Sequence, residues 1–468
     1  MKSLFLLFVL LPIWFLNAQP LNGNYTIGGS SPDFLTLQEA ANALKWRGVS
    51  GPVFMNIRPG VYMQDGGLSS VMILDSIINS PTNRITFQPD ESAGGNVENV
   101  ILQINLITQT TTALVNIKTD YTTIRNLTFQ DVDSAEAGAD YLLSINNIHI
   151  YNPTNEGIVV EGCRFIGNSH PTGGMVFGTD YGIVGTWAVL DIVIRRNSFQ
   201  RLMRSVDIGY LGTAGSGRSY AGDVIVEDNE ILKAHFGVTG AGGLRGHGIL
   251  VQAHNAIVRR NYLNNADGRG SNEGIWVMAD SGLVERNTIV NGGGTIGSGG
   301  GQNPYYYGID VRGLSVLGGQ SQYTMVVNNM VSGCTSMDQV IGIHVDTKKA
   351  KIVHNTIVNT GGQNSIEIYL DPPSDSCTVL NNILIEYGSS DGHAGRRIIF
   401  KQDWGMSGLI SDYNVFYYSD SLALIATRGY PNWYSSLSEY QAATGLDSNS
   451  IFKEIYFEIS ENYPHLSD

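Results

Sequence analysis

Two similar pentapeptides carry charged residues whose types and spacing could support catalysis. Asp310 and Arg312 belong to "GIDVR" (308–312), and His344 and Asp346 belong to "GIHVD" (342–346). Carboxyl and imidazole groups can exchange protons near neutral pH, and a guanidinium can hold an anionic group. If the two segments are neighbouring strands, these side chains share one surface. Their chemistry therefore depends on the elements that carry them.

The tetrapeptide at the start of these segments recurs along the chain. "GILV" (248–251) and "GIWV" (274–277) precede it, and the looser forms "SIEI" (365–368) and "RIIF" (397–400) follow. Along a strand, side chains alternate between the two faces, so the residue between two buried apolar residues points outward. Stacked copies predict a first outward row of Leu250, Trp276, Asp310, His344, Glu367 and Ile399. A second outward row, two residues further along, contains Gln252, Met278, Arg312, Asp346, Tyr369 and Lys401.

A second repeat is centred on asparagine. It occurs at Asn197, Asn229, Asn261, Asn287, Asn329, Asn355, Asn382 and Asn414, at spacings of 26 to 42 residues. An apolar residue lies two positions after each Asn, and Ile or Val lies three positions before it in seven of the eight copies. These two positions are five apart, so one straight strand would place them on opposite faces. We therefore expect a corner at each Asn, with the Asn in the left-handed conformation and its side chain in a hydrogen-bonded ladder.

These two repeats resemble those of right-handed parallel β-helix proteins of the pectin-lyase-like superfamily, over about residues 120–420. The stretch "EGCRFIGN" (161–168) looks like an earlier coil, with Cys163 at the Asn position and Phe165 inward. The segment 24–62 is similar to the opening of exported β-helix proteins from Bacteroidota. The resemblance implies an all-β solenoid of about ten three-strand coils. This fold hosts lyases, hydrolases, adhesins and inert stalks, so it does not define an activity.

The chain divides into four expected segments. Residues 1–18 have a lysine, an apolar run and a small residue at a cleavage point, which is typical of a signal peptide. Residues 19–62 should form an N-terminal cap with a helix over 36–49, where Thr36 and Glu39 have capping-box spacing. Residues 63–420 should form the solenoid. Residues 421–468 resemble the closing segment of the family, and we expect it to be truncated.

Composition narrows the class of partner. The net charge of −14 argues against nucleic acid as a partner, and no stretch after the signal peptide is long and apolar enough to span a membrane. Three cysteines allow at most one disulfide. We expect an exported monomer, either secreted or held at the cell surface.

Aromatic residues beside the charged rows favour a glycan as partner. Trp276 is outward, and Tyr305, Tyr306 and Tyr307 end a glycine-rich insertion that leads into the Asp310 strand. Aromatic faces beside carboxylates suit sugar rings. We therefore expect a polysaccharide or cell-surface glycan to bind, with Tyr369 and Lys401 as further contacts. The alternative is that the tyrosines pack their loop onto the solenoid wall.

Two enzyme mechanisms could use this surface, with Asp310, Arg312, His344, Asp346 and Glu367 as candidate catalytic residues. In a hydrolase, Asp310 and Asp346 could act as the paired carboxyl groups. In a lyase, Ca²⁺ held by Asp310, Asp346 or Glu367 could neutralise a uronate carboxylate, with His344, Arg312 or Lys401 as the base. The alternatives are a non-catalytic adhesin, a structural stalk, or a solvated strand face without function.

Overall fold

The structure is a computed structural model, and the statements below concern the residues that it describes. These are 19–63, 71–104, 113–132, 141–146, 155–167, 181–186, 189–202, 204–209, 221–232, 246–264, 272–294, 305–314, 323–358, 361–372, 374–387, 397–403, 406–419, 423–429 and 432–455. The predicted signal peptide lies outside them.

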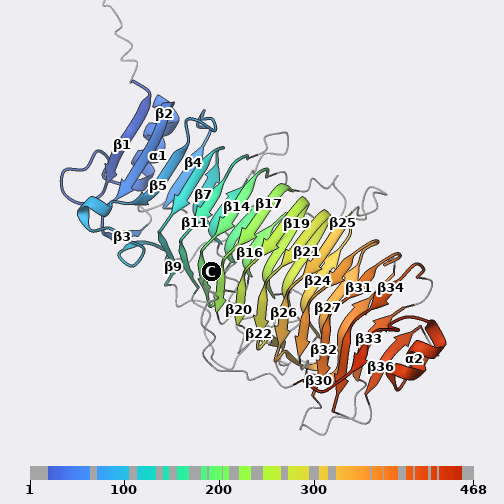
Figure 1. Cartoon of the computed structure of the whole chain (residues 1–468). Helices are drawn as coiled ribbons and strands as arrows, with labels where there is room; N and C mark the ends of the chain where they lie inside the picture. Colours follow the sequence, from blue (N-terminus) through green and yellow to red (C-terminus); the bar gives the residue numbers. More distant parts are fainter. Residues whose placement is uncertain are drawn as a thin grey trace, which may run out of the picture.

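The chain forms a right-handed parallel β-helix, as the repeats predicted (Figure 1). Its described strands form a 25-stranded sheet and a 13-stranded sheet. The longest strands of the larger sheet, β19 (Gly246–Arg259) and β21 (Asn272–Glu285), carry both a "GIxV" segment and the segment before an Asn. Two sides of each coil thus belong to one sheet. The thirteen strands of the second sheet exceed the ten coils expected, because Gly60–Met63 and Val100–Ile104 precede the repeat region of 120–420 and Ile451–Phe452 follows it.

The larger sheet also contains the strands β1 (Leu21–Ile27), β2 (Val49–Ile57), β4 (Met72–Asp75), β5 (Ile85–Pro89), β7 (Ala113–Lys118), β8 (Thr122–Arg125), β10 (Tyr141–Asn146), β11 (Val159–Glu161), β13 (Tyr181–Thr186), β14 (Ile192–Arg195), β16 (Arg204–Ile208), β17 (Ala221–Glu227), β23 (Gly293–Gly294), β24 (Tyr305–Arg312), β25 (Tyr323–Val327), β27 (Thr335–Asp346), β28 (Lys351–Val353), β30 (Gly361–Leu370), β31 (Thr378–Leu380), β33 (Arg397–Gln402), β34 (Ile410–Asp412), β36 (Leu424–Arg428) and β37 (Trp433–Tyr434). Its strands pair in parallel, apart from β36 and β37, which are antiparallel.

The second sheet forms the third side of the coils. It contains β3 (Gly60–Met63), β6 (Val100–Ile104), β9 (Thr128–Asp131), β12 (Arg164–Ile166), β15 (Ser198–Gln200), β18 (Glu230–Leu232), β20 (Tyr262–Asn264), β22 (Thr288–Val290), β26 (Met330–Ser332), β29 (Thr356–Val358), β32 (Ile383–Glu386), β35 (Val415–Tyr418) and β38 (Ile451–Phe452). The apolar residue two positions after each Asn lies here and is buried in the core. Phe199 is one of these residues, and it continues a stack with Phe165 and Phe129 from the equivalent positions of two earlier coils, at ring-centroid distances of 4.9 and 4.8 Å.

The eight asparagines form one continuous hydrogen-bonded ladder, as expected. From Asn197 to Asn414, each Nδ2 donates to the Oδ1 of the next Asn at 2.9–3.1 Å. The same Oδ1 accepts the backbone N–H of the preceding Asn, as in Asn261 N to Asn287 Oδ1 at 3.0 Å. The backbone N–H of Cys163 donates to Asn197, so Cys163 does occupy the asparagine position of an earlier coil. All three cysteines are buried and free.

The expectation that each Asn takes the left-handed conformation was wrong. The left-handed residue is the one before it: φ is +55° at Arg196, +53° at Arg260 and +58° at His354. This preceding residue makes the bend, and its side chain points away from the core. The Asn follows with its amide turned inward, where its donor and acceptor both find partners. Asparagine is therefore required at the corner for its side-chain amide and not for its backbone preference.

A helix lies at each end of the solenoid. The expected N-terminal helix is α1 (Leu37–Arg47); Thr36 Oγ1 accepts the N–H of Glu39, and Glu39 accepts the N–H of Leu35. Its buried face, including Leu37 and Leu44, joins the hydrophobic core beside β1 and β4. Near the C-terminal end, α2 (Leu437–Thr444) is capped by Ser436 in the same way. No helix in the described part of the chain is long and apolar enough to cross a membrane.

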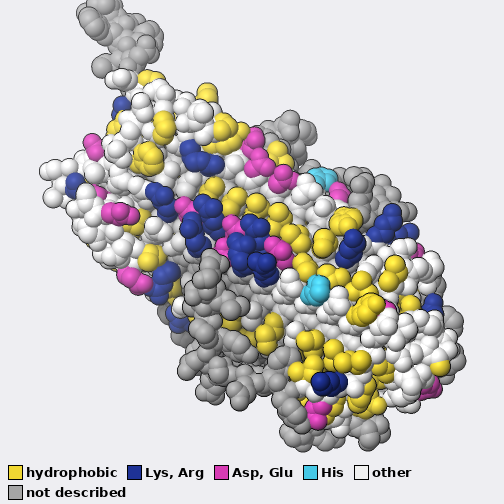
Figure 2. All heavy atoms as spheres, in the orientation of Figure 1, with side chains coloured by type: hydrophobic (Ala, Val, Ile, Leu, Met, Phe, Trp, Pro, Cys, Tyr) yellow, Lys and Arg dark blue, Asp and Glu magenta, His cyan; other side chains and the backbone are white. Residues whose placement is uncertain are grey.

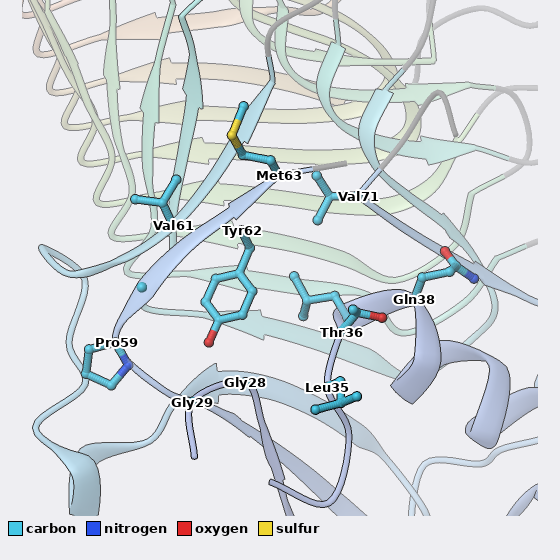
Figure 3. Close-up of a pocket in the computed structure, with 12 residues that line it drawn as sticks. Gly28, Gly29, Leu35, Thr36, Gln38, Pro59, Val61, Tyr62, Met63 and Val71 are labelled. Carbon is cyan, nitrogen blue, oxygen red and sulfur yellow. The ribbon is translucent and has the colours of Figure 1, made fainter. Parts of the chain in front are cut away.

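A cavity of about 330 Å³ lies at the N-terminal end, between the start of α1 and β3 (Figure 3). The Tyr62 ring lies against Gly28, where an added Cβ would stand 2.3 Å from the tyrosine hydroxyl oxygen. Gly28 also has a φ of +74°, so this close approach and this backbone both require glycine. The cavity is lined by residues 28 to 71 and shares none with the candidate catalytic strands.

The ladder predicts a specific stability effect. Replacing Asn287 with Ala removes the hydrogen bonds from Asn287 Nδ2 to Asn329 Oδ1 and to the Val258 carbonyl, and it removes the acceptor used by Asn261. Because these partners are buried, we expect the free energy of unfolding to fall by about 2–4 kcal/mol in chemical denaturation. The control is Asn264→Ala, an outward and partly exposed asparagine on β20, which should change it by about 0.5 kcal/mol or less. Equal losses in the two variants would contradict the ladder's role.

Candidate functional site

Four adjacent strands, β24, β27, β30 and β33, carry most of the candidate residues. The register pairs Trp276 with Asp310 and Asp310 with His344. It then pairs His344 with Tyr369 and Tyr369 with Lys401. The first outward row is therefore Trp276, Asp310, His344, Tyr369 and Lys401. The predicted row was correct up to His344 and wrong beyond it.

Glu367 and Ile399 do not belong to the first outward row. Both side chains are fully buried. Glu367 lies where the earlier coils have a glycine: a Cβ on Gly342 would stand 2.7 Å from the Glu367 carbonyl oxygen. The error has a simple cause, since "SIEI" and "EIYL" both alternate and a two-residue shift leaves an alternating pattern unchanged. Tyr369 and Lys401 were placed in the second row for the same reason.

The second outward row gains two carboxylates that sequence reasoning missed. Arg312 pairs with Asp346. Asp371 directly follows Leu370, the partner of Val345, and Asp403 directly follows Gln402, the partner of Leu370. The second row is therefore Arg312, Asp346, Asp371 and Asp403. The signal was available in the repeated endings "HVD", "YLD" and "KQD".

Asp310 is the centre of a buried ionic cluster. Its carboxylate accepts hydrogen bonds from Arg312 Nε, at 3.1 and 3.0 Å, and from Arg312 Nη2 at 2.6 Å. His344 Nδ1 lies 2.8 Å from Asp310 Oδ1, and His344 Nε2 lies 3.6 Å from Asp371 Oδ2. The Arg312 guanidinium also lies over the Trp276 ring, 5.1 Å from its centroid. One connected chain of contacts thus runs from Trp276 to Asp371.

The first outward row points away from the core, but most of it is shielded from solvent. Asp310 is 0% exposed, His344 4% and Trp276 7%. The predicted outward direction therefore does not mean exposure to water, because strand alternation defines direction and says nothing about what covers a side chain. Asp346 and Asp371 in the second row are partly exposed, and the Asp371 side chain is 37% exposed. These two carboxyls are therefore more accessible than Asp310 and His344.

Burial and charge act against each other in this cluster. Burial by itself would raise the pKa of Asp310, but the charges of His344 and Arg312 and their hydrogen bonds outweigh it and lower that pKa. Burial by itself would lower the pKa of His344, but Asp310, with help from Asp371, raises it to about 9. At neutral pH the cluster therefore holds an ionised Asp310, a protonated His344 and a charged Arg312.

The two accessible carboxyls have opposite pKa shifts. Burial raises the pKa of Asp346 to about 6, and repulsion from Asp371 adds to the shift against the attraction of His344 and Arg312. The protonated His344 ring, whose Nε2 lies 3.6 Å from Asp371 Oδ2, lowers the pKa of Asp371 and outweighs the effect of burial. One carboxyl of this adjacent pair can therefore hold a proton at mildly acidic pH, while the other stays ionised. Such divergence between neighbours is typical of acid–base catalytic pairs.

Aromatic side chains frame the cluster. The Tyr307 ring stacks on His344 at a centroid distance of 5.1 Å, and Tyr369 lies on the other side at 5.2 Å. The Tyr369 hydroxyl donates to Asp403 at 2.6 Å and also lies 3.1 Å from Asp371 Oδ1. Lys401 Nζ lies 3.7 Å from the Tyr369 ring centroid and 3.5 Å from Asp403. These contacts place Tyr369 and Lys401 at the site, with Asp403 as their shared partner.

The predicted tyrosine triplet is divided by the strand. Tyr307 joins the cluster, whereas Tyr306 points inward and is fully buried in the hydrophobic core. Its ring takes the space beside Gly292, where an added Cβ would stand 2.2 Å from the ring. The Tyr305 side chain lies outside what the structure describes. Tyr306 is therefore a packing residue and not a substrate contact.

The residues proposed to hold Ca²⁺ do not form a metal site. Asp310 is occupied by Arg312 and His344, and Glu367 lies in the interior. Within the described ranges, no group of three or more His, Cys, Asp or Glu side chains is arranged to hold a metal ion.

Comparisons with known proteins leave the family open. No protein-family model and no curated protein matches the sequence. Among solved structures, the chain is similar to the GH136 lacto-N-biosidase from Eubacterium ramulus, with 10% identity and a TM-score of 0.40, over 84% of this chain and 67% of that one. It is also similar to a mutant tailspike protein of E. coli bacteriophage HK620 in complex with a pentasaccharide, with 12% identity and a TM-score of 0.32. That match covers 85% of this chain and 59% of the tailspike. At such values the similarity says nothing of what this chain binds.

The His344 cluster predicts how stability depends on pH. The pKa of His344 is raised to about 9 in the folded protein, against about 6.5 in an unfolded chain. Its contribution is therefore fully present below about pH 6.5 and is lost as the pH rises through about 9. We expect the free energy of unfolding to fall by about 3 kcal/mol across this window. His344→Gln should flatten the curve from denaturant titrations at each pH, and a curve parallel to that of the unmutated protein would contradict the cluster's charge state.

Proposed function

We propose that the outer face of β24, β27, β30 and β33 binds a polysaccharide and hydrolyses it, with Asp346 as the general acid and Asp371 as the nucleophile. The observation that carries this proposal is the geometry of two partly exposed carboxyls at the ends of neighbouring strands, of which only Asp371 lies within ion-pair distance of His344. The pKa shifts of the two carboxyls in opposite directions agree with this arrangement. Aromatic rings beside them provide apolar surfaces of the kind that sugar rings stack on. The signal-peptide pattern of residues 1–18 supports action outside the cell.

The strand geometry favours a retaining mechanism. Asp346 and Asp371 extend from neighbouring strands, and such strands lie about 4.8 Å apart. The carboxyl groups of retaining glycosidases stand about 5–5.5 Å apart, whereas inverting enzymes need about 6.5–9.5 Å. Asp310 and Asp346, the pair suggested by the sequence, cannot act as the two catalytic carboxyls. Asp310 is inaccessible, and its carboxylate is bound by Arg312 and His344.

The reaction would proceed in two balanced steps. Asp346 gives its proton to the glycosidic oxygen as the bond from that oxygen to the sugar C1 breaks, and an Asp371 carboxylate oxygen forms a bond to C1. Water then attacks C1 and loses its proton to Asp346. The bond between C1 and Asp371 breaks, which restores the carboxylate and the acid. The pKa of about 6 at Asp346 suits the first step under mildly acidic conditions.

His344 would act through Asp371 and not on the sugar. Its protonated ring lies between Asp310 and Asp371, and its ion pair with Asp371 is the main cause of the low pKa of Asp371. The two positive charges of Arg312 and His344 are balanced by the two negative charges of Asp310 and Asp371, so no charge in the cluster is left uncompensated. Asp310, Arg312 and His344 are thus positioning residues in this mechanism.

The charge of the face favours neutral sugars over uronates. Four carboxyls, Asp310, Asp346, Asp371 and Asp403, stand against three cations, Arg312, His344 and Lys401. The cations are all engaged by these carboxyls, so an incoming uronate would meet no unengaged cation among them. Elimination on a uronic acid needs its carboxylate neutralised, which makes a lyase the weaker hypothesis.

The test is a purified mature protein incubated with a panel of neutral and acidic polysaccharides. We expect reducing ends to appear with a neutral polysaccharide, with activity falling as the pH rises through about 6, where Asp346 loses its proton. Asp346→Asn and Asp371→Asn should each lower kcat by at least about 100-fold with little change in the melting temperature. The matched control is Asp280→Asn, at an exposed carboxyl on β21 that pairs with His254, which should keep full activity.

The other outcomes point to the other functions. Binding without cleavage, measured by glycan array and calorimetry, would leave a non-catalytic adhesin. No binding to any polysaccharide would leave a structural stalk. Unsaturated products that absorb in the ultraviolet would instead indicate a lyase, and they would overturn the roles given to Asp346 and Asp371.

A further inference from the structure

A second outer face, on the side of the coils that leads into the Asn corner, carries a continuous apolar stripe. The register stacks one outward apolar residue from each of six successive strands, β11, β14, β17, β19, β21 and β25. They are Val159, Val193, Ile225, Ile257, Leu283 and Met325, and each is partly exposed. Water-exposed strand faces are normally polar, so an uninterrupted apolar row suggests that another surface covers it.

A ladder of alternating charges runs beside the stripe. Two residues further along, the register stacks Arg125 of β8 with Glu161, Arg195, Glu227, Arg259 and Glu285 of β11 to β21, and Val327 of β25 ends this row. Arg195 contacts Glu161 at 2.7 Å, and Arg259 contacts Glu227 at 2.7 Å. Figure 2 shows hydrophobic side chains next to this mixture of basic and acidic ones. On the other side of the stripe lie Asp223 and Asn255, which are hydrogen-bonded at 2.6 Å.

We propose that this face is a dimer interface that binds the same face of a second copy of the chain, in place of the monomer expected from the sequence. The reason is self-complementarity. Let a two-fold axis lie in the interface, parallel to the strands and midway between β17 and β19. The second copy then has its coils in the reverse order, but each of its rows lies opposite the same row of the first copy. The apolar stripe then packs on the partner's stripe, with Ile225 against the partner's Ile257. Sheets that pack face to face in this way keep their strands nearly aligned.

The charge ladder complements itself under the same axis. Because the signs alternate, reversing the order sets Glu227 against the partner's Arg259 and Arg195 against the partner's Glu285. On the other side, Asp223 meets the partner's Asn255. Like charges meet at the exposed rim, where Arg196 comes opposite the partner's Arg286. A match of apolar and charged rows in one register is what an isologous interface requires.

The size of the surface indicates a weak dimer. Six strands spaced about 4.8 Å apart give a length of about 24 Å, and the rows give a width of about 14–20 Å. The two faces together would bury on the order of 700–1,000 Å², below the roughly 1,200–2,000 Å² of stable specific interfaces and in the range of weak, transient ones. We therefore expect a dissociation constant in the micromolar range, measured by sedimentation velocity of the mature protein across concentrations.

Paired charge variants test the register. Ile225→Lys alone and Ile257→Asp alone should each raise the dimer Kd by at least about tenfold, because each buries a charge against an isoleucine. Mixed in equal amounts, they should form a heterodimer, since Lys then meets Asp at one contact and isoleucine meets isoleucine at the other. The control is Thr356→Lys, at an outward position on β29 in the other sheet, which should leave the Kd unchanged.

Crosslinking supplies a test that needs no charged residue. In this register Val193 faces the partner's Leu283 across about 10 Å, whereas Val193 lies roughly 17 Å from the partner's Val193. The double variant Val193→Cys, Leu283→Cys should therefore form a covalent dimer with a short bismaleimide, and each single variant should not. The three native cysteines are buried. A protein that stays monomeric at about 100 µM, or single variants that crosslink as well as the double one, would overturn the proposal.

Discussion

The hydrogen-bonded asparagine ladder is the constraint on which the rest of this structure depends. Every coil must turn a corner with its backbone directed at the core, where an unpaired N–H or C=O is costly. The Asn amide satisfies these groups in two coils at once. Asn229 Nδ2, for example, donates to the Ile194 carbonyl of the previous coil and to Asn261 Oδ1 of the next. A coil that slipped by one residue would lose these bonds, so the ladder fixes how successive coils align.

That alignment creates the rows on both outer faces. Once the corners are in register, residues at equal distances from each Asn lie side by side on neighbouring strands. Asp310, His344 and Tyr369 come together on one face, and the apolar stripe forms on the other. The glycines of "GIxV" allow the coils to stack closely, since a Cβ on Gly274 would stand 2.7 Å from the Gly308 carbonyl oxygen. Both faces are thus consequences of the same stacking.

The two faces differ in how they handle charge. In the candidate site, carboxylates and cations are gathered behind two accessible carboxyls, and burial makes each charge depend on its partners. This dependence separates the proton affinities of Asp346 and Asp371. On the apolar stripe face, the charges alternate, so the ladder is nearly neutral along its length, and its buried carboxylates Glu161 and Glu227 are paired with arginines. The first arrangement suits chemistry, and the second suits recognition of a matching surface.

The sequence by itself determined the coil phase, the solenoid fold, the asparagine ladder and the direction of Asp310, Arg312, His344 and Asp346, because these follow from odd and even spacings. It could not decide the register of β30 relative to β27, because an alternating pattern looks the same after a two-residue shift. Asp371 was therefore missed and Glu367 was misplaced. Nor could it decide burial: Asp310 is outward and yet 0% exposed. The tertiary structure alone decided these points, since burial and proton affinity depend on neighbours distant in sequence.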